Sequence, residues 1–342
     1  MTQTRSITLA SRPSGSPVAD NFALKQRTLA APGEGEFLVR IIWLSLDPYM
    51  RGRMDDVKSY APPVAIGEVM EGGAVGEVIG SNHAEYAIGD IVTGQFGWTS
   101  HAVSNGEGVR KVDPTLAPIS TALGVLGMPG ITAWAGLNEI AGAQAGETIV
   151  VSAATGAVGG MVCQLAREKG MRVIGVAGGV EKCAFAVENL GAEACFDHRA
   201  NDAKSLSKAI KSAAPEGVHV YFDNVGGKTL EAVLTQMKTG GRIAVCGAIS
   251  WYSGQGIGEA QPLPAVWRSI LTRRLRVQGF IIFDHFNLMA QFQREVGPLV
   301  GNGTIKVRES VTEGLENAPE AFMAMLKGGN FGKQLVRVSA DP

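Results

Sequence analysis

The sequence predicts an α/β protein in which a β-rich domain is followed by a doubly wound parallel sheet. Its length of 342 residues fits two domains better than one. Hydrophobic residues make up 45% of the chain and charged residues 18%, which is enough apolar material for packed cores. The pattern of the sequence also changes near Ile131, from short punctuated segments to alternating strand-like and helix-like segments.

The N-terminal part contains short apolar segments that Gly, Pro and Asp interrupt every few residues. Strand candidates lie at residues 36–43, 73–80 and 90–94. Short strands with this punctuation favour a small barrel-like β domain, which we expect to span residues 1–125.

The following segment alternates between the two periodicities. Strand candidates lie at 148–151, 172–176, 218–222, 242–246 and 275–282, and helix candidates at 157–169, 181–190 and 229–238. Such alternation predicts a parallel sheet with helices on both faces, over residues 126–295. The tail, residues 296–342, ends in a strand candidate at 334–338, and we expect it to rejoin the first domain.

The loop AATGAVG, residues 153–159, lies between the first of these strands and its helix. Ala153, Gly156 and Gly159 have the spacing of a dinucleotide-binding glycine loop in which Ala replaces the first Gly. The N–H groups at the start of the helix can bind a pyrophosphate. We therefore expect a nicotinamide cofactor here, the alternative being a plain strand–helix turn without a ligand.

The residues after the second strand indicate which nicotinamide cofactor binds. NAD-selective folds place a carboxylate there, about 20 residues after the loop, whereas this chain has Gly178 and Gly179. Lys182 and Arg199 can supply positive charge to a 2′-phosphate. NADPH is thus favoured over NADH, although Lys182 could also be an ordinary solvated lysine at the start of a helix.

Composition argues against several classes of partner. The net charge of −1 does not favour nucleic acid or an anionic membrane. The uncharged stretch 148–166 is too rich in Gly and small polar residues near its middle for a lipid-facing helix. The N-terminus lacks the apolar core of a secretory signal, and the four cysteines show no paired spacing, so we expect a reduced, cytoplasmic protein.

A catalytic zinc is not expected. No cysteine precedes Cys163, and His83 and His101 stand alone in the first domain. A nucleoside triphosphatase is also excluded, because the GKT at 227–229 has Phe222 where a phosphate-binding loop needs its first glycine.

Eight segments, in this order, resemble the zinc-free medium-chain dehydrogenase/reductases. Their closest resemblance is to the branch of prostaglandin reductases, plant alkenal double-bond reductases and bacterial curcumin reductases. The segments are DPYMR at 47–51, MPGITA at 128–133, AATGAVG at 153–159, GGVEK at 178–182, DNVGG at 223–227, CGAIS at 246–250, QGFII at 278–282 and NFGK at 330–333.

The resemblance implies a GroES-like β-barrel-type domain joined to a Rossmann domain, and NADPH-dependent reduction of the C=C bond of α,β-unsaturated ketones and aldehydes. It places Lys182 at the 2′-phosphate. The other cofactor-binding residues that it implies are Gly156, Ala157, Val158, Gly159, Asn224, Cys246, Gly247, Ala248, Ile249, Ser250, Tyr252, Phe280, Ile281, Ile282 and Asn330. Two positions depart from the pattern: His198 stands where mammalian members have a phosphate-contacting tyrosine, and Trp251 stands where smaller residues are common.

Hydride transfer to the β-carbon of an enone leaves negative charge on the carbonyl oxygen, so catalysis needs a donor there and later a proton at the α-carbon. Tyr252 is the candidate donor, with help from the cofactor's ribose hydroxyl; alternatively, Tyr252 only packs or binds ribose. Tyr49 is expected to line the substrate pocket, with the alternative of a turn residue beside Pro48. Cys246 lacks a neighbouring base in sequence, so packing is its expected role.

Other functions are weighed against this one. None of the five tyrosines has a lysine four residues later, which excludes a short-chain dehydrogenase. A quinone oxidoreductase of the same superfamily and a non-catalytic NADPH-binding protein stay open. An unpaired apolar edge strand at 275–282 would allow a homodimer.

Overall fold

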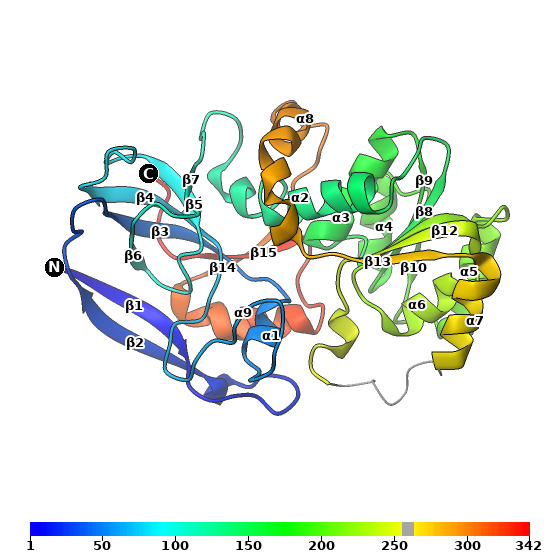
Figure 1. Cartoon of the computed structure of the whole chain (residues 1–342), viewed down its shortest axis with the longest axis horizontal. Coiled ribbons are helices and arrows are strands. Elements are labelled where there is room, and N and C mark those ends of the chain that lie inside the picture. Colours follow the sequence, from blue (N-terminus) through cyan, green and yellow to red (C-terminus); the bar gives the residue numbers. More distant parts are fainter. Residues whose placement is uncertain (255–262) are drawn as a thin grey trace. The chain divides into compact units, whose positions relative to one another are not determined.

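The computed structural model describes residues 1–254 and 263–342 and divides into two compact units (Figure 1). The first unit comprises Met1–Gly127 and Glu309–Pro342, and the second comprises Met128–Arg308. No helix among these described residues is long and apolar enough to cross a membrane.

The first unit contains a sheet in which strands from the two ends of the chain are neighbours. Its order is β14-β15-β3-β4-β5-β7, with β6 also pairing with β3, and β1 and β2 form a separate antiparallel pair. The bounds are β1 Thr2–Leu9, β2 Phe22–Leu29, β3 Phe37–Ser45, β4 Ala74–Ser81, β5 Ile91–Gly94, β6 His101–Ser104, β7 Arg110–Lys111, β14 Glu309–Glu313 and β15 Lys333–Arg337, with short helices α1 Met50–Arg53 and α9 Ala318–Leu326.

Burial explains why the tail belongs to this unit. Strand β3 is buried along almost its whole length, as expected for a strand with neighbours on both sides. β15 pairs antiparallel with β3 and supplies the buried Leu335 and Val336. From α9, Phe322 packs edge-on against the buried Trp98. The tail therefore completes both the sheet and the core of the first unit.

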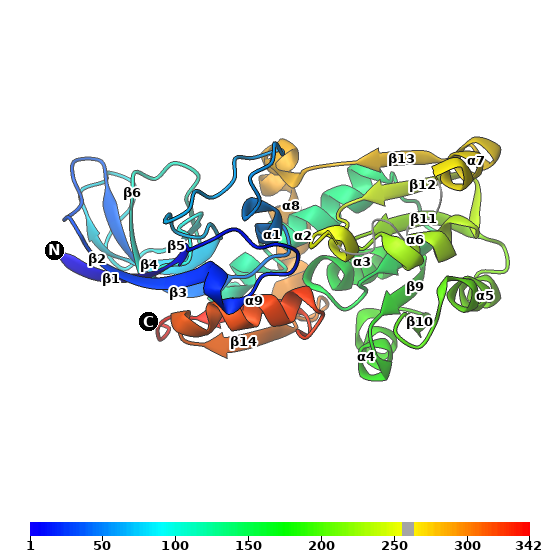
Figure 2. The same cartoon turned by 90° about the horizontal axis from the view of Figure 1, so that it is seen from below.

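The second unit is a six-stranded sheet of order β10-β9-β8-β11-β12-β13, and all of its pairs are parallel. Numbered from β8, this is the order 3-2-1-4-5-6 of the Rossmann fold. The α2 and α3 helices lie on one face and α5 and α6 on the other (Figures 1 and 2). The strands are β8 Thr148–Ser152, β9 Arg172–Ala177, β10 Ala194–Asp197, β11 Val218–Asp223, β12 Met237–Val245 and β13 Arg276–Gly279; the helices are α2 Met128–Ala135, α3 Ala157–Glu168, α4 Val180–Leu190, α5 Ala203–Ala213, α6 Gly227–Leu234, α7 Leu263–Arg273 and α8 Met289–Gly301.

Two elements differ from the sequence prediction. The helix expected at 229–238 is α6, which ends at Leu234, because Met237 pairs with Val218 and begins β12. The strand expected at 275–282 is limited to Arg276–Gly279, and a 3-10 helix, Ile282–Leu288, follows at once. Periodicity could not separate these neighbours, since short apolar runs fit either element.

Residues 296–308 belong to the second unit, although the sequence assigned them to the C-terminal segment. Helix α8 runs through position 295 without a break and buries Phe292, Val296 and Val300 on one face. Beyond it, the side chain of Gln164 on α3 bonds both the N–H and the carbonyl of Lys306. Because of these contacts, the second unit ends at Arg308 and not at residue 295.

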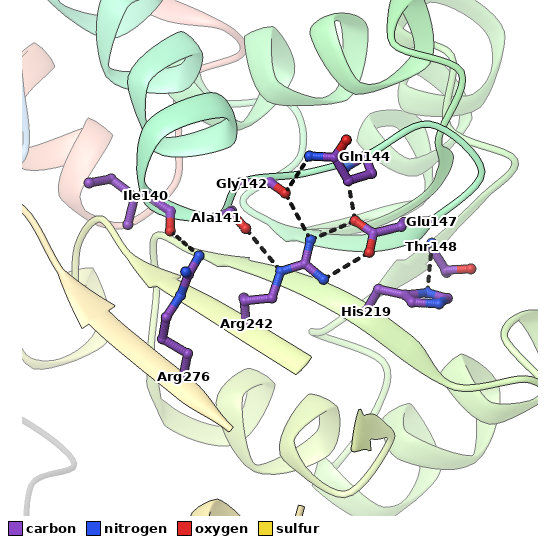
Figure 3. Close-up of polar contacts among 9 residues, drawn as sticks. All are labelled: Ile140, Ala141, Gly142, Gln144, Glu147, Thr148, His219, Arg242 and Arg276. Carbon is purple, nitrogen blue, oxygen red and sulfur yellow. Dashed lines mark hydrogen bonds and ion pairs between the residues drawn. The ribbon is translucent and has the colours of Figure 1, made fainter. Parts of the chain in front are cut away.

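A charged network fastens the amino ends of the strands to the turn before β8 (Figure 3). Arg242 of β12 binds both carboxylate oxygens of Glu147, at 2.8 and 2.6 Å, and donates to the carbonyls of Ala141 and Gly142. Arg276 of β13 donates to the carbonyl of Ile140. These bonds satisfy the last carbonyls of the π-helical turn Gly136–Ile140 and its exit. Arg242 thus joins three segments through one side chain.

We predict that Arg242→Met destabilises the second unit by about 3 kcal/mol, because it removes the cation paired with the mostly buried Glu147 and leaves the carbonyl of Ala141 without its side-chain donor. The measurement is the midpoint of urea unfolding followed by circular dichroism. Arg172→Met is the matched control: it removes a pair with Glu193 whose side chains are about half exposed, and should cost roughly 0.5 kcal/mol or less. Equal shifts in the two variants would contradict the prediction.

Candidate functional site

The carboxyl ends of β8, β11 and β12 lie side by side in the second unit, because these strands are neighbours in a parallel sheet. The chain order reverses between β8 and β11. In doubly wound sheets the ligand binds at the carboxyl ends beside such a reversal. The segments that leave these strands are therefore the candidate site.

The loop after β8 replaces the first glycine of the motif with Ala153, and this residue adopts a left-handed conformation with φ of 49°. Such a conformation costs an L-residue roughly 1–2 kcal/mol, and strained backbone of this kind is common at ligand-binding sites. Its presence in this loop therefore favours a functional role for the loop. Gly156 begins α3 with extended backbone, and no side chain caps the helix. A Cβ on Gly159 would lie 2.2 Å from the carbonyl oxygen of Ala153, so only glycine lets the helix approach the turn this closely.

The loop geometry fits a pyrophosphate. The first N–H groups of an α-helix have no intrahelical partner and carry the positive end of the helix dipole. In α3 these groups belong to Ala157, Val158 and Gly159, next to the strand ends. The residues that the sequence assigned to the pyrophosphate therefore form one continuous helix start.

A single buried carboxylate organises the exit of β11. Oδ1 of Asp223 accepts hydrogen bonds from Ser152 Oγ, Tyr221 Oη, and the N–H groups of Val225 and Gly226, at 2.7–3.2 Å. Burial raises the pKa of Asp223, and these donors counteract that rise. Ser152 also accepts from the N–H of Asn224 through Oγ, and its carbonyl accepts from the Asn224 side chain, both at 2.8 Å. Asn224 is thereby held between β8 and β11.

The turn after β12 packs on the turn after β11. Ser250 Oγ donates to the carbonyl of Val225, and the ring of Trp251 covers Gly226, where a Cβ would lie 2.6 Å from the indole. The hydroxyl of Tyr252 accepts from the N–H of Ala248 at 3.2 Å and lies against Gly247. The candidate donor is thus held over the backbone of residues 247–248.

Cys246 begins the turn after β12. Its N–H donates to the carbonyl of Asp223, and burial raises the pKa of its thiol to about 12. A thiol with so high a pKa is not a nucleophile at neutral pH, and the packing role expected from the sequence stays a prediction.

Positive groups gather at the end of β9. Gly178 and Gly179 follow this strand, and a Cβ on Gly178 would meet Arg199 Nε at 2.9 Å and His198 Nε2 at 3.0 Å. Lys182 lies close enough to Arg199 for the two charges to interact, and both act on His198. Asp197, the nearby carboxylate, accepts from the N–H groups of Gly179 and Arg199, both at 2.8 Å. The place that a ribose-binding carboxylate would occupy is cationic.

Two predicted residues lie in the first unit. Tyr49 precedes α1, and burial together with the charges of Asp47 and Glu71 raises the pKa of its phenol. The turn that carries Tyr49 is fixed by the buried Lys333 of β15, which donates to Asp47 Oδ1 at 2.6 Å and to the carbonyl of Leu46 at 2.8 Å. Asn330 donates to the carbonyl of Gly332.

The segment 280–282 follows β13. The ring of Phe280 packs against Phe222 and over Gly136, and Ile282 is buried.

Among residues 1–254 and 263–342, no group of three or more His, Cys, Asp or Glu side chains could hold a metal ion.

Comparison with known proteins assigns almost the whole chain to one family. Residues 5–112 match a family model described as the N-terminal domain of oxidoreductase, and residues 157–296 match one described as zinc-binding dehydrogenase. The chain is 48% identical to NADPH-dependent curcumin reductase of Escherichia coli (strain K12), over 97% of this chain and 96% of that protein. The chain belongs to the medium-chain dehydrogenase/reductase family. The sequence prediction of this family is confirmed.

Two further comparisons support the branch and the fold of this medium-chain reductase. It is 42% identical to prostaglandin reductase 1 of Mus musculus, over 98% of this chain and 100% of that protein. The crystal structure of CurA from Vibrio vulnificus in complex with NADPH aligns with a TM-score of 0.93 and 46% identity, covering 98% of this chain and 100% of that one. The predicted two-domain α/β fold is confirmed.

Sequence reasoning missed the residues that hold the site together. The sequence indicates Asp223 only as part of the segment DNVGG, and Ser152 and Tyr221 belong to none of the motifs. Their signal was present: a carboxylate and a serine at the ends of two adjacent parallel strands must lie close together. Lys228, considered only as part of a false phosphate-loop motif, acts electrostatically on His198.

Proposed function

We propose that this medium-chain reductase uses NADPH to reduce the C=C bond of α,β-unsaturated ketones and aldehydes. The observation that carries the proposal is full-length similarity, at 48% identity, to a curcumin reductase named as NADPH-dependent. The helix start at Gly156–Gly159 and the cations around Gly178 support it, because they suit the two phosphate-bearing parts of this cofactor.

The cofactor, when bound, supplies the hydride, and the protein positions both reactants. Residues 156–159 hold the pyrophosphate, while Lys182 and His198 hold the 2′-phosphate. The ribose and nicotinamide are held by residues from the two interlocked turns and from later segments, namely Asn224, Cys246, Gly247, Ala248, Ile249, Ser250, Tyr252, Phe280, Ile281, Ile282 and Asn330. Tyr49 lines the substrate pocket.

Tyr252 is proposed as the donor to the developing enolate. Its oxygen already accepts from the Ala248 N–H, so the phenol is oriented before any substrate arrives. An oriented donor stabilises negative charge in the transition state without reorganisation.

The decisive assay follows the absorbance of reduced nicotinamide with an enone and, separately, with a quinone. We expect NADPH turnover with the enone, and Tyr252→Phe should lower kcat on it by about 100-fold while leaving NADPH affinity nearly unchanged. Tyr86→Phe is the control, because Tyr86 bonds the carbonyl of Val109 within the first unit.

The outcomes separate the alternatives. Turnover of the quinone alone would replace the proposed substrate class, and turnover of neither would favour a protein that only binds NADPH. Unchanged kcat in Tyr252→Phe would remove Tyr252 from the mechanism and leave it as a residue that packs or binds ribose.

Lys182→Ala should raise KM for NADPH about tenfold and leave KM for NADH unchanged, since only NADPH carries the 2′-phosphate. Initial rates with both cofactors measure this. Lys208→Ala, on the exposed side of α5, serves as a control of equal charge change. If both cofactors were affected equally, the 2′-phosphate role of Lys182 would be wrong.

A homodimer through the β13 edge is also proposed. In the described part of the chain β13 pairs only with β12, and α7 carries an exposed apolar row of Leu263, Trp267 and Leu271 at four-residue spacing. Such an edge and row favour pairing with a second copy. Light scattering should give a dimer for the parent and a monomer for Trp267→Glu; a monomeric parent would refute the proposal.

A further inference from the structure

His198 is fixed at the rim of the cationic cluster. It directly follows β10, and its backbone N–H donates to the carbonyl of Ala177, the last residue of β9, at 3.0 Å. This bond brings the imidazole to Gly178, where Nε2 lies 3.0 Å from the position that a Cβ would take. The ring therefore occupies space that a side chain at position 178 would need.

The charged groups around His198 come from each neighbouring element. Lys182 lies on α4, Lys228 on α6, Arg199 in the next position of the chain, and Asp197 at the end of β10. Asp197 alone favours a protonated ring, and its Oδ1 already accepts two backbone N–H bonds. The burial of the ring and the three cations lower the pKa of His198, so the imidazole is neutral at pH 7 without cofactor.

A 2′-phosphate changes this balance. A phosphomonoester has a second pKa of about 6 and carries close to two negative charges at neutral pH. Placed among Lys182, Arg199 and His198, it offsets the cations and offers acceptor oxygens to a ring that donates from both nitrogens only when protonated. We propose that His198 takes up a proton when the 2′-phosphate of NADPH binds, which makes the affinity for NADPH, but not for NADH, depend on pH. The inference rests on the proposed 2′-phosphate site.

The direction of the dependence follows from linkage. The pKa of His198 is higher with phosphate bound than without, so protons are taken up at pH values between the two. Affinity for NADPH therefore falls as pH rises through the pKa of the bound state. Below about pH 6 the phosphate itself gains a proton, which weakens its attraction to the cations.

Calorimetric titration tests the proposal directly, without enzyme turnover. NADPH and NADH are titrated into the protein at pH 7 in buffers of different ionisation enthalpy, which yields the number of protons taken up on binding. The parent should take up more protons than His198→Gln with NADPH, and the two should agree with NADH. Proton release by the phosphate itself is common to both proteins, so the difference isolates His198.

The affinities give a second readout. His198→Gln should weaken NADPH binding by about tenfold at pH 7, which corresponds to a shift of roughly one unit in the pKa of His198 between the free and the bound state. The difference in NADPH affinity between the parent and His198→Gln should become smaller as pH rises. His83→Gln, a substitution in the first unit, should keep the parent's proton uptake and its pH profile. A histidine NMR signal that is missing only in His198→Gln should shift towards the protonated form when NADPH is added.

Each outcome has a distinct meaning. Equal proton uptake by the parent and His198→Gln, with NADPH still preferred over NADH, would overturn the proton linkage and leave the 2′-phosphate site in place. Equal affinity of the parent for NADPH and NADH would instead refute the proposed 2′-phosphate site itself.

Discussion

The arrangement of the strand ends in the second unit depends on the hydrogen bonds that the buried carboxylate of Asp223 accepts. One buried oxygen accepts from β8 through Ser152, from β11 through Tyr221, and from the turn N–H groups of Val225 and Gly226. Parallel pairing aligns the strands, but it leaves the segments beyond their ends free to choose a conformation. Asp223 removes that freedom, because a buried carboxylate without its donors would be costly.

The hydrogen bonds around Asp223 also determine where Asn224 and the turn after β12 lie. Asn224 is fixed by Ser152, and the turn after β12 is fixed through Val225 and Gly226, onto which Ser250 and Trp251 pack. Tyr252 then bonds the backbone of Ala248 in the same turn. Trp251, an unusual residue in the sequence, has a structural reason here: its ring fills the space over Gly226, where any side chain would collide.

The sequence could predict the doubly wound parallel sheet, the glycine loop at 153–159 and most elements, because hydrophobic periodicity and glycine spacing are local. It could not place the end of α6, where an apolar residue, Met237, follows a helix and joins a strand through a distant partner, Val218. Nor could it find the bond from Ser152 to Asp223, which spans 71 residues, or the bond from Arg242 to the carbonyl of Ala141, which spans 101. Hydrogen bonds between distant segments leave no periodic trace. Gly178 indicates a missing carboxylate, and His198 and Arg199, which the sequence also indicated, follow β10 and occupy the space beside it.

The two ends of the proposed dinucleotide site differ in the groups that would bind phosphate. At the proposed pyrophosphate end, the ligand would meet neutral backbone. Ala153 in a left-handed conformation and Gly159 without a side chain let the turn approach the start of α3, whose N–H groups do not titrate. At the proposed 2′-phosphate end, side chains carry the charge, and burial together with the neighbouring cations lowers the pKa values of Lys182 and His198. Cations held this close together repel one another, and a bound dianion would offset that repulsion. In the proposed site, the cluster therefore increases the preference for NADPH over NADH and not the affinity for both. In the proposed site, the backbone at the pyrophosphate end would not distinguish NADPH from NADH, and the titratable side chains at the other end would.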